Sequence, residues 1–138
     1  MIRIDKQQQL VIAMLAGPLA WFAFQQLGLL PAALAGWALW RFVLVQPVIE
    51  ELVFRGAMQQ WLLKRVPQQL GFLSWANIIT AVVFTLAHFV YHPPLWALAV
   101  FVPALLFGYF RDRYDHVWPA LLLHTWYNAG FFLLPVLL

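Results

Sequence analysis

The chain has 138 residues, of which 64% are hydrophobic and 9% charged, with a mean hydropathy of +0.80 and a formal net charge of +3. A soluble domain has about 25% charged residues, and so small a core could not bury this much apolar surface. We therefore expect the lipid bilayer to surround most of the chain. The basic residues form no patch, which argues against nucleic-acid binding, and the absence of cysteine excludes disulfides and thiolate metal sites.

Six apolar stretches follow one another along the chain, separated by Gln, Pro or charged residues that are typical of turns. They cover residues 10–24, 27–45, 52–63, 72–91, 95–110 and 117–138. The first follows two basic residues, like the start of a signal peptide, but a second apolar stretch comes after it instead of a polar mature domain. We therefore expect it to be the first transmembrane helix.

Basic residues near the ends of the stretches predict the topology, because cytoplasmic loops of membrane proteins are enriched in Lys and Arg. Three basic groups lie between stretches: Arg3 with Lys6, Lys64 with Arg65, and Arg111 with Arg113. All three are cytoplasmic if the segment 27–63 makes one net crossing. The sequence therefore predicts an all-α fold, a polytopic transmembrane helix bundle of one domain (residues 1–138) with about five net crossings.

The segment 27–63 is too long for one simple crossing. As one helix it would measure about 55 Å, nearly twice the ~30 Å hydrocarbon core. Pro47 lies inside it, and a proline removes a helical hydrogen bond and clashes with the preceding turn. We expect one kinked or broken helix here, with a bent second half that carries Glu50 and Glu51.

Ionisable residues inside the apolar stretches are the strongest pointer to function. Each costs roughly 2.5–3.5 kcal/mol at the centre of a membrane helix, so their presence demands a reason. The residues in question are Glu50, Glu51, Arg55, His88 and His124, joined by the polar Asn128. We expect the functional site among them.

Helical spacing predicts different surroundings for Glu50 and Glu51. Glu51 and Arg55 are four residues apart, so they share a helix face and can form an ion pair. Glu50 points about 100° away from that face, and the sequence places no basic residue four positions before or after it. Glu50 is therefore the candidate general base.

Two other positions suit the same chemistry. His124 and Asn128 are four residues apart, and both side chains can donate hydrogen bonds, so together they could hold a developing oxyanion. His88 follows Phe84 by four residues near the end of its stretch. From there it could share a water molecule with Glu50.

Three motifs occur in order along the chain. Glu-Glu-x-x-x-Arg starts at Glu50, Phe-x-x-x-His starts at Phe84 and His-x-x-x-Asn starts at His124. One such motif occurs by chance in many chains, whereas three in this order, each on an apolar stretch, are specific. On these residues the sequence resembles the CAAX protease and bacteriocin-processing (CPBP, or Abi) family of intramembrane proteases.

This resemblance implies an intramembrane glutamic endopeptidase. Carried over by position, Glu50 with help from His88 would activate a water molecule, and His124 with Asn128 would form the oxyanion hole. The substrate would be a membrane-associated protein or peptide: a prenylated C-terminus, a bacteriocin leader peptide or a membrane-anchored sorting tail. Small size and the lack of eukaryotic targeting features favour a prokaryotic inner membrane.

Glu51 and Arg55 match motif positions for which the resemblance implies a supporting structural role. No cofactor is expected, since the helical His-Glu-x-x-His zinc signature is missing. Zinc is the alternative, because the family was long described as metal-dependent. Glu50, His88 and His124 are chemically able to bind it.

A non-enzymatic membrane protein is the rival hypothesis. The same carboxylate and histidines suit a small proton or cation transporter subunit, or an immunity or binding module that keeps the motifs without activity. Serine protease chemistry is not expected, because Ser74 is the one serine and lacks a Gly-x-Ser-x-Gly context. His92 and His116 lie in breaks between stretches, and we interpret them as solvated loop residues.

Overall fold

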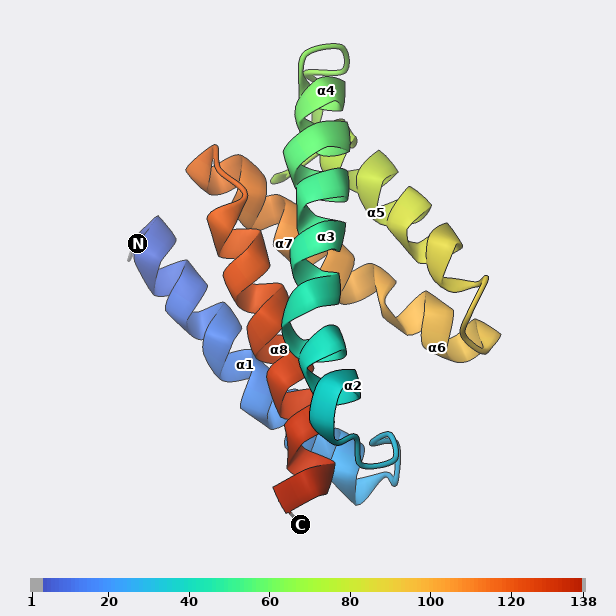
Figure 1. The fold of residues 1–138 in the computed structure, drawn as a ribbon. Coiled ribbons are helices and arrows are strands. Elements are labelled where there is room, and N and C mark those ends of the chain that lie inside the picture. The colour runs from blue at the N-terminus through green and yellow to red at the C-terminus, as the bar shows by residue number, and fades with distance from the viewer. Residues whose placement is uncertain (1–3, 138) are drawn as a thin grey trace. The chain divides into compact units, whose positions relative to one another are not determined.

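The computed structural model describes residues 4–137, and most of them are helical (Figure 1). The all-α fold class is confirmed, apart from a short two-stranded hairpin. The chain divides into two compact units, Met1–Ile49 with Leu121–Leu138 and Glu50–Ala120, which are described separately.

In the first unit, α1 (Lys6–Gln26) packs side by side with α8 (Trp118–Leu137) (Figure 1). Three side chains bridge these helices by donating to backbone carbonyls: Trp21 to Tyr127 (3.2 Å), Trp126 to Met14 (2.9 Å) and Tyr127 to Ala13 (2.7 Å). Close approach depends on Gly130, where an added Cβ would lie 1.9 Å from the Trp21 ring. Small residues that let helices approach are typical of membrane bundles.

One helical run from residue 36 to residue 63 alternates between α and π hydrogen bonding. It consists of α2 (Gly36–Trp40), the π-helix η1 (Arg41–Val45), α3 (Gln46–Glu51), the π-helix η2 (Leu52–Gln59) and α4 (Gln60–Leu63). The run is continuous through Pro47, so the helix is not broken there, and the predicted kink stays a prediction. The Gln46 N–H donates to the Arg41 carbonyl, which widens the turn just before the proline that has no N–H.

Buried residues recur every four positions along this run: Val43, Pro47, Glu51, Arg55 and Gln59. In a regular α-helix, with 3.6 residues per turn, each step of four would rotate the series by about 40°. The wider π turns offset that rotation. The π segment η2 therefore explains how the carboxylate of Glu51, the guanidinium of Arg55 and the amide of Gln59 come to lie on one buried face.

The second unit is built from η2 and the helices that follow it. α5 (Trp75–His88) packs against α7 (Phe101–Tyr114), and both contact η2, while α6 (Pro94–Ala99) contacts α5 and α7. The core consists of Ala81, Phe84 and Ala104, with Phe54, Val100, Phe101 and Leu105 packed against it.

A hairpin connects α4 to α5 in this unit. It pairs β1 (Gln69–Leu70) with β2 (Leu73–Ser74) in antiparallel fashion, and Gly71 takes the left-handed φ of 63° at the turn. Ser74 then caps α5, because its hydroxyl accepts a hydrogen bond of 3.0 Å from the Asn77 N–H.

The charged segment that was predicted as a break after residue 110 is largely helical. α7 continues to Tyr114 and ends at Asp115, which has a left-handed φ of 52°. The helix tolerates Asp112 because the carboxylate accepts hydrogen bonds from Gln59 (2.8 Å) and Ser74 (2.5 Å). These partners lie far away in the sequence, so the local pattern did not reveal them.

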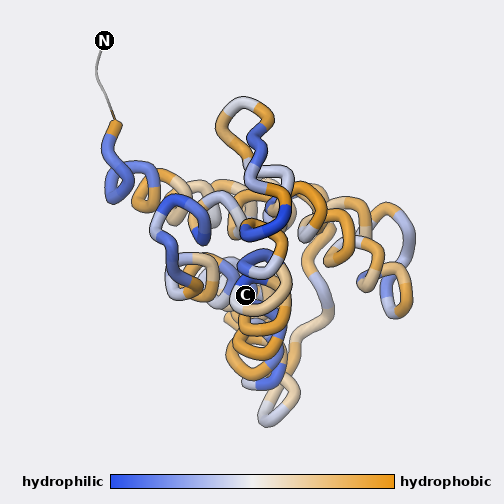
Figure 2. Tube along the Cα trace, turned by 90° about the horizontal axis from the view of Figure 1, so that it is seen from above, coloured by the Kyte–Doolittle hydropathy of each residue, from blue (hydrophilic) through white to orange (hydrophobic). Residues whose placement is uncertain are grey.

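Among residues 4–137, two helical segments are long and apolar enough to cross a membrane, namely Pro94–Tyr114, which joins α6 and α7, and Trp118–Leu137. Figure 2 shows hydrophobic residues along much of the tube and hydrophilic residues at the start of α1. α1 is 21 residues long, but glutamines at both of its ends lower its mean hydropathy. The number of crossings stays a prediction.

Candidate functional site

The Glu51–Arg55 ion pair predicted from spacing is confirmed. Arg55 Nη1 lies 3.0 Å from Glu51 Oε1, and both side chains are fully buried. Arg55 Nη2 also donates to the Ala104 carbonyl at 3.0 Å, and the guanidinium lies 4.5 Å from the Phe84 ring centroid. A buried charge requires such compensation, so this pair acts as a fixed support within the second unit.

Glu50 has a different environment from its neighbour. It is partly exposed, whereas Glu51 is fully buried, as the rotation of about 100° between successive residues predicts. The Glu50 carboxylate is within electrostatic reach of Arg55 and of His92. A partly solvated carboxylate beside a compensated ion pair has the access to water that a general base needs.

His88, the last residue of α5, is oriented by its own helix. Its Nδ1 lies 2.8 Å from the Phe84 carbonyl oxygen. A carbonyl oxygen only accepts hydrogen bonds, so Nδ1 is the protonated nitrogen in this contact. In the neutral ring Nε2 is then the acceptor, which is the form that can accept a hydrogen bond from water.

Phe84 contacts residues of both the Glu-Glu-x-x-x-Arg and the Phe-x-x-x-His motif. Its buried ring contacts the Arg55 guanidinium and packs edge-on against Phe54, with centroids 5.0 Å apart. Its ring also lies 4.4 Å from the His88 ring, and its carbonyl holds the His88 Nδ1. Phe-x-x-x-His therefore places the histidine on the same support as the Glu51–Arg55 pair.

His92 is a residue that the sequence analysis missed. It lies in the turn after α5, yet it is partly buried, and its ring stacks on that of His88 with centroids 5.6 Å apart and planes at 18°. Burial and the neighbouring His88 lower the pKa of His92, while the Glu50 carboxylate acts in the opposite direction. His92 lies in a turn, as expected, but it is partly buried rather than fully solvated, and its spacing of four from His88 was a usable signal.

The His-x-x-x-Asn motif lies on α8, in the part that belongs to the first unit. His124 is buried and Asn128 is partly buried. The Asn128 side-chain amide donates a hydrogen bond of 2.9 Å to the Phe42 carbonyl in η1. The amide carries two N–H donors, of which this bond occupies one.

Helix irregularity explains why the Phe42 carbonyl accepts this bond. In an α-helix its partner would be the Gln46 N–H, but that group donates to the Arg41 carbonyl. The next residue is Pro47, which has no N–H. Asn128 thus donates a hydrogen bond to the Phe42 carbonyl, which these two helical donors do not reach because of the π segment and Pro47.

This geometry predicts energetic coupling between Asn128 and Pro47. Asn128→Ala should destabilise the chain by about 0.6–1.7 kcal/mol, the range for side-chain hydrogen bonds in membrane bundles. In the Pro47→Ala background the cost should be smaller, because a restored backbone N–H can bond within the helix. Unfolding of the two single variants and the double variant in detergent measures the coupling; equal costs in both backgrounds would contradict it.

Among residues 4–137, no group of three or more His, Cys, Asp or Glu side chains is arranged to hold a metal ion. Glu50 and His88, which are potential oxygen and nitrogen ligands, both belong to the second unit. The alternative of zinc on Glu50, His88 and His124 stays a prediction that metal removal can test.

A family model described as type II CAAX prenyl endopeptidase, Rce1-like, matches residues 32–130, well over half of the chain. The chain belongs to the Rce1-like family. The resemblance to CAAX proteases drawn from the three motifs is thereby confirmed, and all three motifs lie inside the matched segment. Comparison with curated proteins and with solved structures gave no match.

Rce1-like proteins are CAAX endopeptidases, so membership makes this chain a membrane protein of the hydrolase class. The apolar helices that are long enough to cross a bilayer agree with this assignment. A CAAX protease also implies a membrane-associated protein as substrate. The family match does not identify the residue that activates the attacking water molecule. The surroundings of Glu50 bear on that question.

Proposed function

We propose that this Rce1-like chain is an intramembrane glutamic endopeptidase that cleaves a membrane-associated protein or peptide. One observation carries the proposal: Glu50 is partly exposed and lies next to the fully buried Glu51–Arg55 pair. Within the same unit, His88 is held by the Phe84 carbonyl so that Nε2 of the neutral ring is an acceptor. Together Glu50 and His88 can orient and deprotonate a water molecule.

The proposed reaction starts with Glu50 taking a proton from this water molecule, while His88 Nε2 accepts a hydrogen bond from it. The hydroxide adds to the scissile carbonyl carbon, and the oxygen of that carbonyl becomes an oxyanion. His124 and Asn128 donate hydrogen bonds to the oxyanion. The C–N bond then breaks, and Glu50 returns its proton to the leaving amine.

His124 and Asn128 are assigned this role by their motif, and the contacts of Asn128 support it. An oxyanion hole requires donors that are fixed before the reaction. The hydrogen bond to the Phe42 carbonyl restrains the Asn128 amide through one N–H. The other N–H can serve as the donor to the oxyanion.

The proposed chemistry uses no cofactor, because a carboxylate can activate water as a general base without a metal. Zinc remains the alternative. The two mechanisms differ in their response to chelation: metal-free hydrolysis will continue in excess EDTA, whereas a zinc enzyme will lose activity and regain it when zinc is added back.

The substrate class follows from the family description. A C-terminal C-a-a-X sequence directs prenylation of its cysteine, and the prenyl chain carries the protein to the membrane. A prenylated C-a-a-X peptide is therefore the test substrate of choice, and we propose membrane-associated proteins or peptides, prenylated or anchored in another way, as the natural substrates. We further propose that residues 1–138 act as one protease core with five net crossings in a prokaryotic inner membrane. Family membership does not favour the transporter or immunity-module hypotheses.

Cleaved protein termini in cells test this function without a chosen substrate. Cells with the wild-type chain should contain membrane-protein fragments that disappear with Glu50→Gln, which keeps the shape of the side chain and removes the base. Gly56→Ala is a matched control in the same helical run, since its added Cβ would meet only the Glu51 carbonyl oxygen, 3.7 Å away. At matched membrane levels, identical termini for wild type and Glu50→Gln would count against the proposal.

A further inference from the structure

The turn between α5 and α6 folds back onto the end of α5. The backbone N–H groups of Tyr91 and His92 both donate to the His88 carbonyl, at 3.2 and 3.0 Å. This closes one more turn after the helix ends. His92 is thereby brought against His88, with the two rings nearly parallel and their centroids 5.6 Å apart.

His92 is itself held in place from the other side of the turn. Trp96 of α6 lies edge-on to the His92 ring, with centroids 6.4 Å apart and planes at 69°. The turn runs into Pro93 and Pro94, whose rings fix their backbone φ angles. Because Trp96 and the prolines already restrain His92, stacking of its ring on His88 costs little further conformational entropy.

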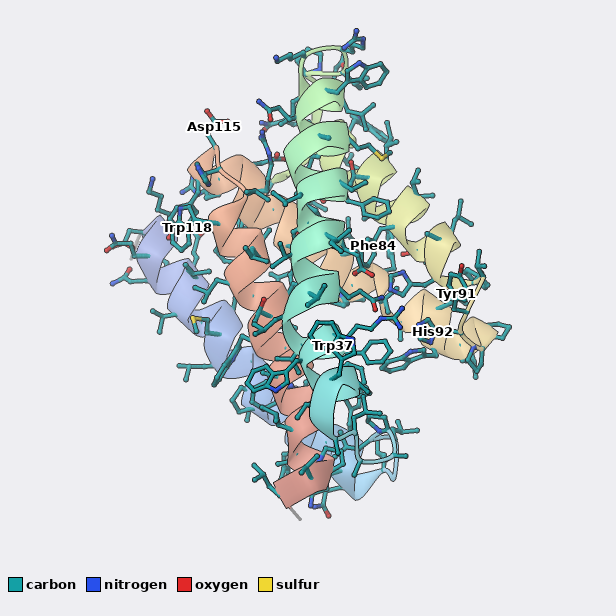
Figure 3. The ribbon with its side chains drawn as sticks, viewed as in Figure 1. Trp37, Phe84, Tyr91, His92, Asp115 and Trp118 are labelled. Atoms are coloured by element: carbon teal, nitrogen blue, oxygen red, sulfur yellow. The ribbon has the colours of Figure 1, made fainter. Side chains whose placement is uncertain are left out.

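The His88 imidazole needs such a restraint. Its hydrogen bond to the Phe84 carbonyl fixes Nδ1, but a single bond lets the ring tilt about it. The stacked His92 ring limits this tilt. Figure 3 labels Phe84 and His92, the residues four positions before and after His88 that contact its ring.

We propose that His92 is a positioning residue, whose ring keeps the His88 imidazole oriented with Nδ1 on the Phe84 carbonyl and Nε2 available to water. The catalytic consequence rests on the proposed function, whereas the effect on the His88 ring does not.

Histidine tautomers report on the positioning directly. In the full chain, labelled with ¹⁵N-histidine and held in detergent micelles at a pH where the His88 ring is neutral, the His88 signals should show a protonated Nδ1 and an unprotonated Nε2. His92→Ala should shift them toward a mixture of tautomers, while His92→Phe, which keeps a flat ring, should leave them near wild type. Tyr91→Ala is the control, since Tyr91 is the adjacent aromatic residue and is 85% exposed. Unchanged His88 signals in His92→Ala, or an equal shift in Tyr91→Ala, would overturn the proposal.

Cleavage kinetics separate this proposal from the proposed function. With a prenylated C-terminal peptide, His92→Ala should lower kcat about tenfold with little change in KM, a part of the roughly 10²–10⁴-fold contribution of general acid–base catalysis. His92→Phe should restore kcat to within about threefold of wild type. If Glu50→Gln cleaves normally, the proposed function fails. The positioning role fails if Glu50→Gln is inactive but His92→Ala has the wild-type kcat. It also fails if the kcat of His92→Phe is no higher than that of His92→Ala.

Discussion

Arg55→Leu is expected to destabilise the folded chain by about 3–5 kcal/mol, because it removes one member of a buried ion pair. The Glu51 carboxylate, which is fully buried, would lose the guanidinium that lies 3.0 Å away. The Ala104 carbonyl and the Phe84 ring would lose their contacts with Arg55 as well. Equilibrium unfolding in mixed detergent micelles measures the loss, and cleavage should fall with it because Glu50 and His88 rest on this support.

A double variant and a surface variant make this test specific. Glu51→Leu combined with Arg55→Leu removes both charges, so it should recover at least half of the stability lost in the single variant. Arg113→Leu, at an exposed position of the second unit, should change stability by less than about 0.5 kcal/mol. If Arg55→Leu is as stable as Arg113→Leu, or the double variant is no better than the single one, the ion pair does not stabilise the unit.

Gly108→Ala is expected to cost about 2–4 kcal/mol, from overpacking together with hydrogen bonds lost by buried amides. The added Cβ would lie 1.9 Å from Asn77 Oδ1 and 2.9 Å from Gln59 Oε1. These amides are buried and cannot move freely, because Asn77 donates to the Leu105 carbonyl and Gln59 donates to the Gly108 carbonyl. The melting temperature in detergent is the simplest measurement.

Gly56→Ala is the matched control for this variant. Both glycines lie in helical segments of the second unit, so the gain in helix propensity is similar at the two positions. At Gly56 the nearest atom to the added Cβ would be 3.7 Å away, which is ordinary contact. Gly56→Ala should therefore be neutral or slightly stabilising, and equal effects of the two substitutions would show that the contact at Gly108 is not tight.

Local spacing predicted part of the site. The Glu51–Arg55 pair and the separate environment of Glu50 depend on neighbouring positions of one helix, where the angle between residues is nearly fixed. The three motifs predicted the family for the same reason: each is a short pattern of residues four or five positions apart on one helix. The family match over residues 32–130 agrees with them.

Contacts between elements that are distant in the sequence could not be predicted in this way. Asn128 donates to Phe42 because a π segment and Pro47 leave that carbonyl without its usual donors, and no single stretch of sequence contains both ends of the bond. Similarly, Asp112 remains in a helix because Gln59 and Ser74 donate to it. The density of charged residues around Asp112 predicts a loop, because a local pattern does not include these distant donors.

The surroundings of Pro47 and His92 show what a local pattern around prolines leaves open. A proline usually ends or kinks a helix, yet the helix passes through Pro47 because the preceding turn is widened. Pro93 and Pro94 marked a break correctly, and the turn in front of them also stacks the partly buried His92 ring on that of His88. In both cases the backbone hydrogen bonds around the proline, rather than the proline itself, decide the structure.

Hydrolysis by the reconstituted chain tests the role of Glu50 most directly. Wild type and Glu50→Gln, at equal amounts of folded protein in liposomes, would be given a prenylated C-a-a-X peptide in excess EDTA, with products identified by mass spectrometry. We predict that the wild-type chain cleaves the peptide and that Glu50→Gln lowers the rate by at least about 100-fold, the lower end of a general-base contribution. Cleavage by Glu50→Gln at the wild-type rate would contradict the assignment of Glu50 as the base, and loss of wild-type cleavage in EDTA, restored by zinc, would contradict the metal-free chemistry.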